Sequence, residues 1–171
     1  MKIELKYMNP GEKASSDELS KIVLARFGLI PRKKDAKAGF HTLLLQLYER
    51  KKKANNEKKP EIAVMTVEEM GAVSGIKRQT MYDYLRRWTS LQVLKKTTLV
   101  NQGVVVTGYE LNGVNLENAF RKAEAIIQEH VNKSIEIVKE LQNEVKKEKL
   151  RKKEDDSEPE EDTISDEPSQ D

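Results

Sequence analysis

The chain has 171 residues, enough for one or two small domains, and 35% of them are charged while only 5% are aromatic. It contains no cysteine, which excludes disulfides and thiolate metal sites, and its two histidines, His41 and His130, are too far apart in the sequence to suggest a metal or catalytic centre. No apolar run approaches the roughly 20 residues of a membrane span, and no leader segment opens the chain, so we expect a soluble cytoplasmic protein.

The net charge of +2 conceals an uneven distribution. Residues 154–171 contain ten Asp or Glu and no Lys or Arg, which leaves 31 basic and 19 acidic residues in 1–153, a net charge of +12. A basic body with an acidic tail is typical of a protein that binds a polyanion. We predict that residues 151–171 form a disordered acidic tail, and we hypothesise that the tail competes with the polyanion for the basic body.

Residues 1–31 predict a strand followed by a helix. Residues 1–7 alternate between apolar and charged side chains, which is the period of a β-strand. The hydroxyls of Ser15 and Ser16, followed by two carboxylates, are typical of a helix start, and Gly28 can end that helix. The apolar stripe that we expect this helix to bury consists of Leu19, Ile22, Val23 and Phe27.

A second helix follows, with apolar residues spaced as on one helix face: Phe40, Leu43, Leu44, Leu47 and Tyr48. His41 lies beside this face, and we expect it at the boundary of the core. The densest positive segment comes next. Its lysines are either a solvated surface or contacts for phosphate groups: Lys51, Lys52, Lys53, Lys58 and Lys59.

Residues 61–65 (EIAVM) are short, apolar and partly β-branched, and they predict a small strand. Thr66 then has the position of a helix N-cap, and Glu69, three residues later, completes a capping box.

Residues 66–94 are the segment around which the rest is arranged. A short helical pattern ends at Gly75 and a longer one follows almost at once, the signature of a helix-turn-helix. The apolar residues of both can share one small core: Met70, Val73, Ile76, Met81, Tyr84, Leu85 and Trp88. The opposite side of the second helix is polar and mainly cationic: Lys77, Arg78, Gln79, Tyr82, Asp83, Arg86 and Arg87. A generic pair of antiparallel helices in a bundle is the alternative interpretation.

Two β-branched runs, VLKKTTLV and VVVTGYELN, flank the turn Asn101-Gln102-Gly103 and predict a β-hairpin. Lys95 and Lys96 are expected on its first strand, and Asn101 and Gln102 at its tip.

Asn115 opens a long helix that we predict to run from 115 to 150 without Pro or Gly. From Ile127 onward its apolar residues repeat every three and four positions, as in a coiled coil: Ile127, Val131, Ser134, Val138, Leu141 and Val145. Pairing with a second copy is the simplest way to cover this seam. A helix folded back over its own domain is the alternative. Ile126, Ile135 and Ile137 lie off the seam and suggest that further helices cover them.

Residues 36–112 resemble the winged helix-turn-helix superfamily, and the register is most similar to that of MarR-like and archaeal transcriptional regulators. The resemblance rests on residues that match the pattern of that family: Met70 and Gly71 within the first helix, Gly75 and Ile76 in the turn, Met81 and Trp88 in the second helix, and Val93 and Leu94 at the start of the wing. The chain departs from the family at Lys77, where a Ser or Thr N-cap is usual, and at Gln92, where a glycine is usual.

The patterns described above and the resemblance together predict a mainly α fold with a small β wing: an N-terminal strand and helix (1–31), a winged helix-turn-helix domain (32–114), a dimerisation helix (115–150) and the tail (151–171). The resemblance also implies a recognition helix over 77–90 that lies in the major groove of double-stranded DNA. Arg78, Gln79 and Tyr82 would face bases, whereas Lys77, Thr80, Arg86 and Arg87 would contact phosphates. Lys95, Lys96, Asn101 and Gln102 would add contacts from the wing.

The function that follows from the resemblance is a homodimeric, sequence-specific transcriptional regulator. The alternatives are an architectural chromosome-binding protein without sequence specificity and a winged-helix protein-interaction module. We expect no enzyme activity and no cofactor, because the sequence contains no nucleophile–base pair, phosphate-binding glycine loop or metal-ligand spacing. Nothing in the sequence indicates a small-molecule ligand.

Overall fold

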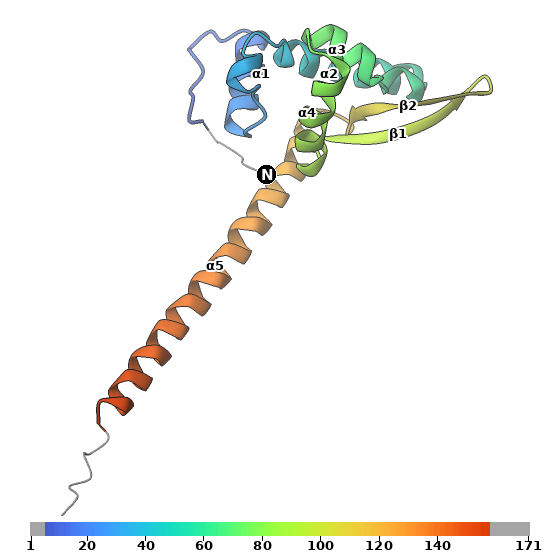
Figure 1. The fold of residues 1–171 in the computed structure, drawn as a ribbon. Helices are drawn as coiled ribbons and strands as arrows, with labels where there is room; N and C mark the ends of the chain where they lie inside the picture. The colour runs from blue at the N-terminus through green and yellow to red at the C-terminus, as the bar shows by residue number, and fades with distance from the viewer. Residues whose placement is uncertain (1–5, 158–171) are drawn as a thin grey trace, which may run out of the picture. The chain divides into compact units, whose positions relative to one another are not determined.

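The computed structural model describes residues 6–157, apart from the side chain of Asn101. Within this range the chain is mainly helical, with a two-stranded antiparallel sheet and a long C-terminal helix (Figure 1). The elements are α1 (Ser16–Arg26), η1 (Lys33–Asp35), α2 (Phe40–Glu57), η2 (Pro60–Ala63), α3 (Val67–Ser74), α4 (Arg78–Ser90), β1 (Leu94–Asn101), β2 (Val104–Leu111) and α5 (Leu116–Asp155). The chain divides into two compact units, Met1–Gln128 (unit 1) and Glu129–Asp171 (unit 2).

The N-terminal helix forms where the sequence predicts it, and of the expected stripe Ile22 is buried, Val23 and Phe27 are half-buried, and Leu19 is exposed. Ser15 caps α1 by accepting a hydrogen bond from the backbone N–H of Glu18 at 3.2 Å. Its buried residues are Ser20, Ile22, Leu24 and Ala25, whereas Leu19 of the expected stripe is 43% exposed. Of the strand predicted over residues 1–7, residues 1–5 lie outside the described part. Lys6 and Tyr7 are not in a strand.

The segment after α2 corrects a second prediction. The strand expected over residues 61–65 is instead the 3₁₀ turn η2, because Pro60 fixes the backbone at its start. Of residues 61–65 only Met65 pairs, in an isolated antiparallel bridge with Tyr109, with N···O distances of 2.9 and 2.8 Å. This bridge joins the hairpin to the helices.

The turn between α3 and α4 follows from local sequence. Thr66 and Glu69 form the expected capping box at the start of α3. Gly75 ends α3 in the left-handed conformation, with φ of 70°, which is unfavourable for residues with a Cβ. Gly71 permits the close approach of the two helices, because a Cβ there would lie 2.6 Å from the carbonyl oxygen of Ile76.

The hairpin is confirmed, with Leu94 opposite Leu111 and Asn101 opposite Val104. Its two-residue loop has positive φ at both positions, 49° at Gln102 and 79° at Gly103, as in a type I′ turn. Gln92, before β1, also has positive φ (58°), which gives a physical reason for the glycine that the resemblance expects there.

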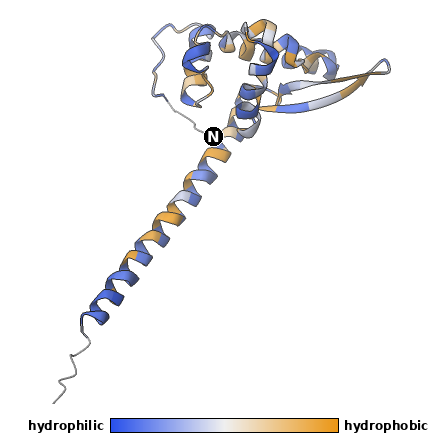
Figure 2. Cartoon of the chain, viewed as in Figure 1, coloured by the Kyte–Doolittle hydropathy of each residue, from blue (hydrophilic) through white to orange (hydrophobic). Residues whose placement is uncertain are grey.

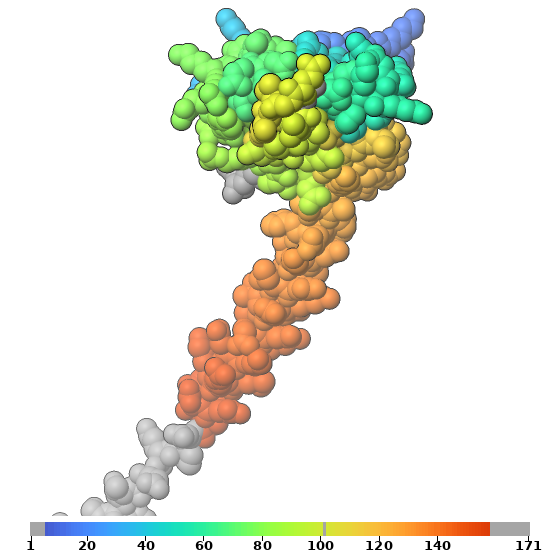
Figure 3. Space-filling model, turned by 90° about the vertical axis from the view of Figure 1, so that its right-hand side faces the viewer, coloured from blue at the N-terminus to red at the C-terminus, as the bar shows by residue number. Residues whose placement is uncertain are grey.

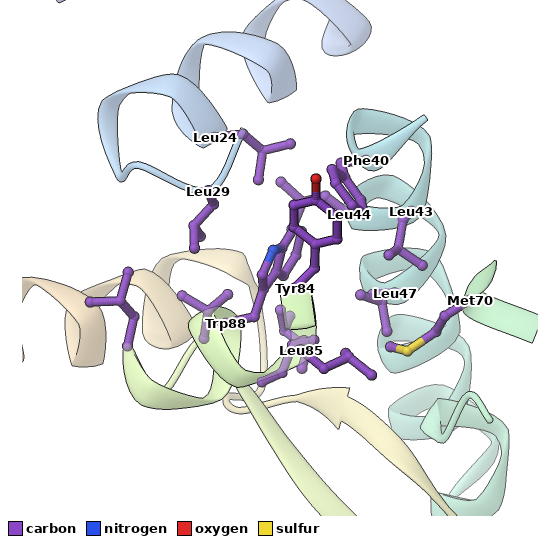
Figure 4. Packing of buried hydrophobic residues seen from close by; sticks show 14 of the residues in the cluster. Leu24, Leu29, Phe40, Leu43, Leu44, Leu47, Met70, Tyr84, Leu85 and Trp88 are labelled. Carbon is purple, nitrogen blue, oxygen red and sulfur yellow. The ribbon is translucent and has the colours of Figure 1, made fainter. Parts of the chain in front are cut away.

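One hydrophobic core holds unit 1 together, and α4 lies at its centre. Figure 4 shows Tyr84 and Trp88 pointing between Leu24 and Leu29 on one side and the residues of α2 on the other. The ring of Phe40 packs edge-on against Tyr84, with centroids 4.6 Å apart. Of the residues predicted to share this core, Met70, Met81, Tyr84, Leu85 and Trp88 are buried, and Val73 and Ile76 are half-buried against it.

The long helix contributes to the same core at its start. Asn115 caps α5 by accepting a hydrogen bond from the N–H of Asn118 at 2.9 Å, and Ala119 and Ala123 are fully buried. The helix continues to Asp155, five residues beyond the predicted end at 150. Residues 158–171 of the predicted tail lie outside the described part. Of the described helices, α2 and α5 have 18 residues or more, and neither has an apolar segment suited to crossing a bilayer.

The contact between Gly108 and Met65 gives a first prediction. A Cβ at Gly108 would overlap the backbone carbonyl of Met65, so Gly108→Ala must separate the hairpin from the bridge. We expect the Gly108→Ala substitution to lower the free energy of unfolding, measured in urea, by about 1–3 kcal/mol. Gly11→Ala is the matched control, because the nearest atom there is 3.7 Å away. Equal stability of the two variants would contradict the importance of this contact.

Candidate nucleic-acid interface

The outer face of α4 carries the candidate residues that remain accessible. Lys77 is the N-cap residue and makes no side-chain capping hydrogen bond, and Lys77, Arg78, Gln79 and Arg86 are exposed. Thr80 and Tyr82 are half-buried at the edge of this face. Because Met81, Tyr84, Leu85 and Trp88 are buried on the inner face, the rotation of α4 about its axis is fixed. We call Lys77, Arg78, Gln79, Thr80, Tyr82 and Arg86 the outer face of α4.

Arg78 is positioned by two neighbours. Its Nε lies 3.0 Å from a carboxylate oxygen of Glu68 on α3, and its guanidinium donates a hydrogen bond to the Tyr82 hydroxyl at 3.3 Å. The same guanidinium lies over the Tyr82 ring at 5.8 Å from the centroid. The hydrogen bond to Tyr82 and the charge of Glu68 raise the pKa of Arg78. Because Arg78 and Glu68 are both about 60% exposed, their ion pair stabilises the fold little and can be exchanged for another anion.

A hollow of about 370 Å³ separates α4 from the hairpin. Its lining is polar and comes from both elements: Gln79, Tyr82, Asp83, Arg86, Thr89, Lys96 and Tyr109. Arg86 is 79% exposed and only loosely paired with Asp83 at 3.7 Å. Lys96 is exposed on β1, across the hollow from it. The hollow therefore joins the outer face of α4 to a cation of the hairpin.

Arg87 does not belong to this surface, contrary to the sequence-based prediction of a phosphate contact. It is half-buried, and its two terminal nitrogens donate to the carbonyl oxygens of Gly28 and Ile30. Burial lowers the pKa of Arg87. The side chain therefore fixes the segment between α1 and η1 against α4, and we remove it from the candidate interface.

Lys51 and Lys95 are also engaged inside the fold. Both contact the carboxylate of Glu110, with N···O distances of 2.7 and 3.2 Å, and Thr97 donates a third contact at 3.0 Å. The side chain of Glu110 is only 8% exposed. Burial alone would raise the pKa of Glu110, but the hydrogen bonds and charges of these partners outweigh it and lower the pKa. Lys51 and Lys95 thus neutralise a buried carboxylate.

The other lysines near the end of α2 form a separate surface. Lys52 and Lys58 are exposed, and Lys53 and Lys59 are paired weakly with Glu57 at 3.8 and 4.0 Å. In Figure 3 the hairpin (yellow) points toward the viewer, with the end of α2 (teal) on one side and α3 and α4 (green) on the other. A ligand on the outer face of α4 must therefore pass the hairpin to reach these lysines.

The hairpin tip is less polar than the sequence suggests. The side chain of Asn101 lies outside the described residues, and Gln102 is exposed. Three valines around them are also exposed, Val100 by 72% and Val104 and Val105 by 63% each. The described part of the tip contains no cation to bind phosphate.

The sequence analysis missed a basic segment beside α4. Arg32 pairs with Asp83 on α4 at 3.2 Å, and the Tyr84 hydroxyl accepts from the Arg32 N–H and donates to Asp35 at 2.5 Å. Burial and the hydrogen bond to Asp35 raise the pKa of Tyr84. These contacts hold the 3₁₀ turn η1, which carries the exposed Lys33 and Lys34, against α4. The positive charge of this segment is visible in the sequence as the run RKKDAK. Its position beside α4 is visible only in the fold.

Comparison with known proteins found no matching family model, no significantly similar curated protein and no significantly similar solved structure. Among the described residues there is also no cluster of three or more His, Asp or Glu side chains suited to holding a metal ion.

The buried carboxylate gives a prediction that can be tested without a ligand. Glu110→Gln leaves Lys51 without its charge partner, and we expect a loss of about 3 kcal/mol in the free energy of unfolding at neutral pH. Because folding lowers the pKa of Glu110, its contribution is fully present above the ordinary value of 4.5 and is lost as the pH falls through the lower folded-state pKa.

Urea unfolding of the natural chain and Glu110→Gln at several pH values measures this difference. We expect the two stabilities to converge below pH 4.5. Glu57→Gln, whose carboxylate is 42% exposed, is the control and should have little effect at any pH. A constant difference between the natural chain and Glu110→Gln would rule out the proposed ionic role.

Proposed function

We propose that unit 1 is a winged helix-turn-helix domain that binds double-stranded DNA through α4, and that the protein is a dimeric transcriptional regulator. The observation that carries this proposal is the asymmetry of α4. Its inner face is buried in the core, while its outer face presents three cations, an amide and a phenol to solvent. Such a surface supplies what binding in the major groove requires, charge for phosphates and forked donors for base edges.

The order and connection of the elements support the same proposal. α3 and α4 are joined by a glycine turn, and a hairpin follows at once, as in a winged helix. Met65 adds a single bridging residue to that hairpin, at the position where the family expects a short strand. In this interpretation α4 is the recognition helix and β1–β2 is the wing.

The contacts of the side chains suggest how the work is divided. Arg78 and Gln79 lie in the first turn of α4, the part of a recognition helix that reaches base edges, and Tyr82 holds Arg78 in place. Arg86 and Lys96, on the two sides of the hollow, and Lys77 at the helix N-terminus would bind phosphates. Lys33 and Lys34 extend the positive surface beyond α4.

Dimerisation would use α5. Its seam residues Val131, Val138 and Leu141 are about half exposed or more, although their spacing is that of a coiled-coil core. A second copy with the same seam is the partner that a two-fold dimer requires. The protein-interaction alternative also has one supporting observation, the exposed valines of the hairpin tip.

Binding to random-sequence duplex DNA across a salt series tests the proposal. If α4 contacts phosphates, log K falls linearly with log salt, with a slope of roughly −0.9 for each phosphate neutralised. Selection of a preferred duplex would then separate a specific regulator from an architectural protein. Binding that is absent at low salt would move the assignment to a protein-interaction module.

Two adjacent arginines provide a matched pair of variants. We expect Arg86→Ala to lower DNA affinity and to reduce the salt slope by about 1, with stability within about 0.5 kcal/mol of the natural chain. Arg87→Ala should instead destabilise the fold by about 1–3 kcal/mol, because the carbonyls of Gly28 and Ile30 lose their donors. Fluorescence anisotropy and urea unfolding distinguish the two effects. Reduced DNA affinity without destabilisation in Arg87→Ala would contradict our division of roles.

A further inference from the structure

The exposed part of α5 has an apolar face that is wider than a simple coiled-coil seam. Figure 2 shows apolar residues (orange) recurring along the helix. Besides the seam residues Val131, Val138 and Leu141, two isoleucines outside the seam are exposed, Ile135 by 51% and Ile137 by 65%. Exposing isoleucines on both flanks of a seam to water is unfavourable. A partner of α5 must therefore bury these isoleucines as well as the seam.

The seam and flank positions of this exposed face are symmetric about Glu136. Residues 131 and 141, 134 and 138, and 135 and 137 are each equally far from it along the helix. The seam positions of any heptad pattern are symmetric in this way. Here the two isoleucines that flank the seam are also symmetric about Glu136. In an antiparallel pair of identical helices, a two-fold axis crosses both helices at one position.

An antiparallel pair centred on Glu136 brings the exposed seam positions of the two copies together. Val131 then lies opposite the partner's Leu141, and Ser134 opposite the partner's Val138. On one flank Ile135 faces its own copy, and on the other flank Ile137 does the same. His130 lies near the partner's Glu144, so the outer positions of the second flank place an imidazole beside a carboxylate.

The parallel pairing leaves the isoleucines facing polar groups. In a parallel pair in register, a flanking residue of one helix approaches the flanking residue five positions later in the other helix. Ile135 would then face the partner's His130, and Ile137 the partner's Gln142. The parallel arrangement has one attractive flank pair, Glu144 with the partner's Lys149, and its β-branched seam residues at 131, 138 and 145 are compatible with it. That charge pair favours the parallel arrangement, but the four isoleucines of the dimer face one another only in the antiparallel one, and we give this larger apolar contact the greater weight.

We propose that α5 binds a second copy of this chain in an antiparallel coiled coil centred on Glu136. This inference deepens the dimerisation in the proposed function and rests on it. At 1.5 Å per residue, the Ala123 residues of the two copies, which mark where α5 leaves the core, lie about 39 Å apart along the pair. In a parallel pair they would be separated only by the interhelical distance of about 10 Å. The antiparallel dimer therefore holds two copies of unit 1 apart.

Disulfide cross-linking can establish the direction, because the natural chain has no cysteine. Val131→Cys and Leu141→Cys are made in separate full-length chains, one of them carrying a mass tag, and mixed before mild oxidation. In the antiparallel pair the two different positions are opposite each other, whereas each is about 15 Å from its own copy along the axis. We expect the tagged–untagged disulfide as the main product. Disulfides within each single variant and none between them would overturn the proposal in favour of parallel pairing.

Light scattering on the natural chain distinguishes a dimer of the wrong direction from the absence of any dimer. A mass twice the 19.6 kDa of the chain is expected, and a monomer at high concentration would overturn both the dimer and its direction. DNA binding by unit 1 is measured independently by the salt series.

A second set of variants tests the flanks without cysteine. Ile135→Asn combined with Ile137→Asn should weaken dimerisation more than tenfold, because both self-facing pairs are lost. Lys139→Asn combined with Glu140→Gln changes the outer side of the same helix and should leave the dimerisation constant unchanged. Equal dimerisation of the two double variants would overturn the assignment of the isoleucines to the interface.

Discussion

The burial of one face of α4 is the constraint on which the rest of unit 1 depends. Tyr84 and Trp88 fill the centre of the core, where α1, α2 and the start of α5 meet them. A helix with two large aromatic rings buried in its middle cannot rotate without opening the core. Hydrophobic packing therefore sets the side of α4 on which Arg78, Gln79 and Arg86 lie, and the contacts of Arg78 with Glu68 and Tyr82 then position its guanidinium on that side.

Neutralising the buried carboxylate of Glu110 is the second constraint, and it explains which lysines are free. A carboxylate that is 8% exposed must be paired, and the hairpin and α2 each supply one lysine for this purpose. The remaining lysines of α2 lie at the surface. The arginines of the proposed DNA surface are instead paired only with exposed carboxylates, Arg78 with Glu68 and Arg86 with Asp83.

The sequence predicted those features that depend on neighbouring residues. The caps at Ser15, Thr66 and Asn115, the glycine turn and the hairpin were all placed correctly, because each is determined by contacts within a few residues. The strand over 61–65 was wrong because Pro60 starts a 3₁₀ turn that overrides the preference of EIAVM for a strand, and Met65 alone keeps a β-bridge. In α1 the expected stripe was placed correctly except for Leu19, which is exposed.

The fate of individual charged residues could not be predicted from sequence. Lys51 and Glu110 are 59 positions apart, as are Arg87 and Gly28, so no local pattern announces either contact. Arg86 and Arg87 are adjacent in the chain and identical in type, yet one is 79% exposed and the other holds two carbonyl groups. In a helix, consecutive side chains point about 100° apart, which is enough to separate a surface residue from an interior one.

The position of α5 has a consequence for how stability is measured. Ala119 and Ala123 belong to the core of unit 1, and the exposed seam that we assign to pairing begins at Val131, about two turns after Ala123 on the same helix. Because one continuous helix serves both purposes, ordering it in the dimer also orders the end that completes the core. Folding and association would then be thermodynamically linked, and the melting temperature of unit 1 would rise with protein concentration.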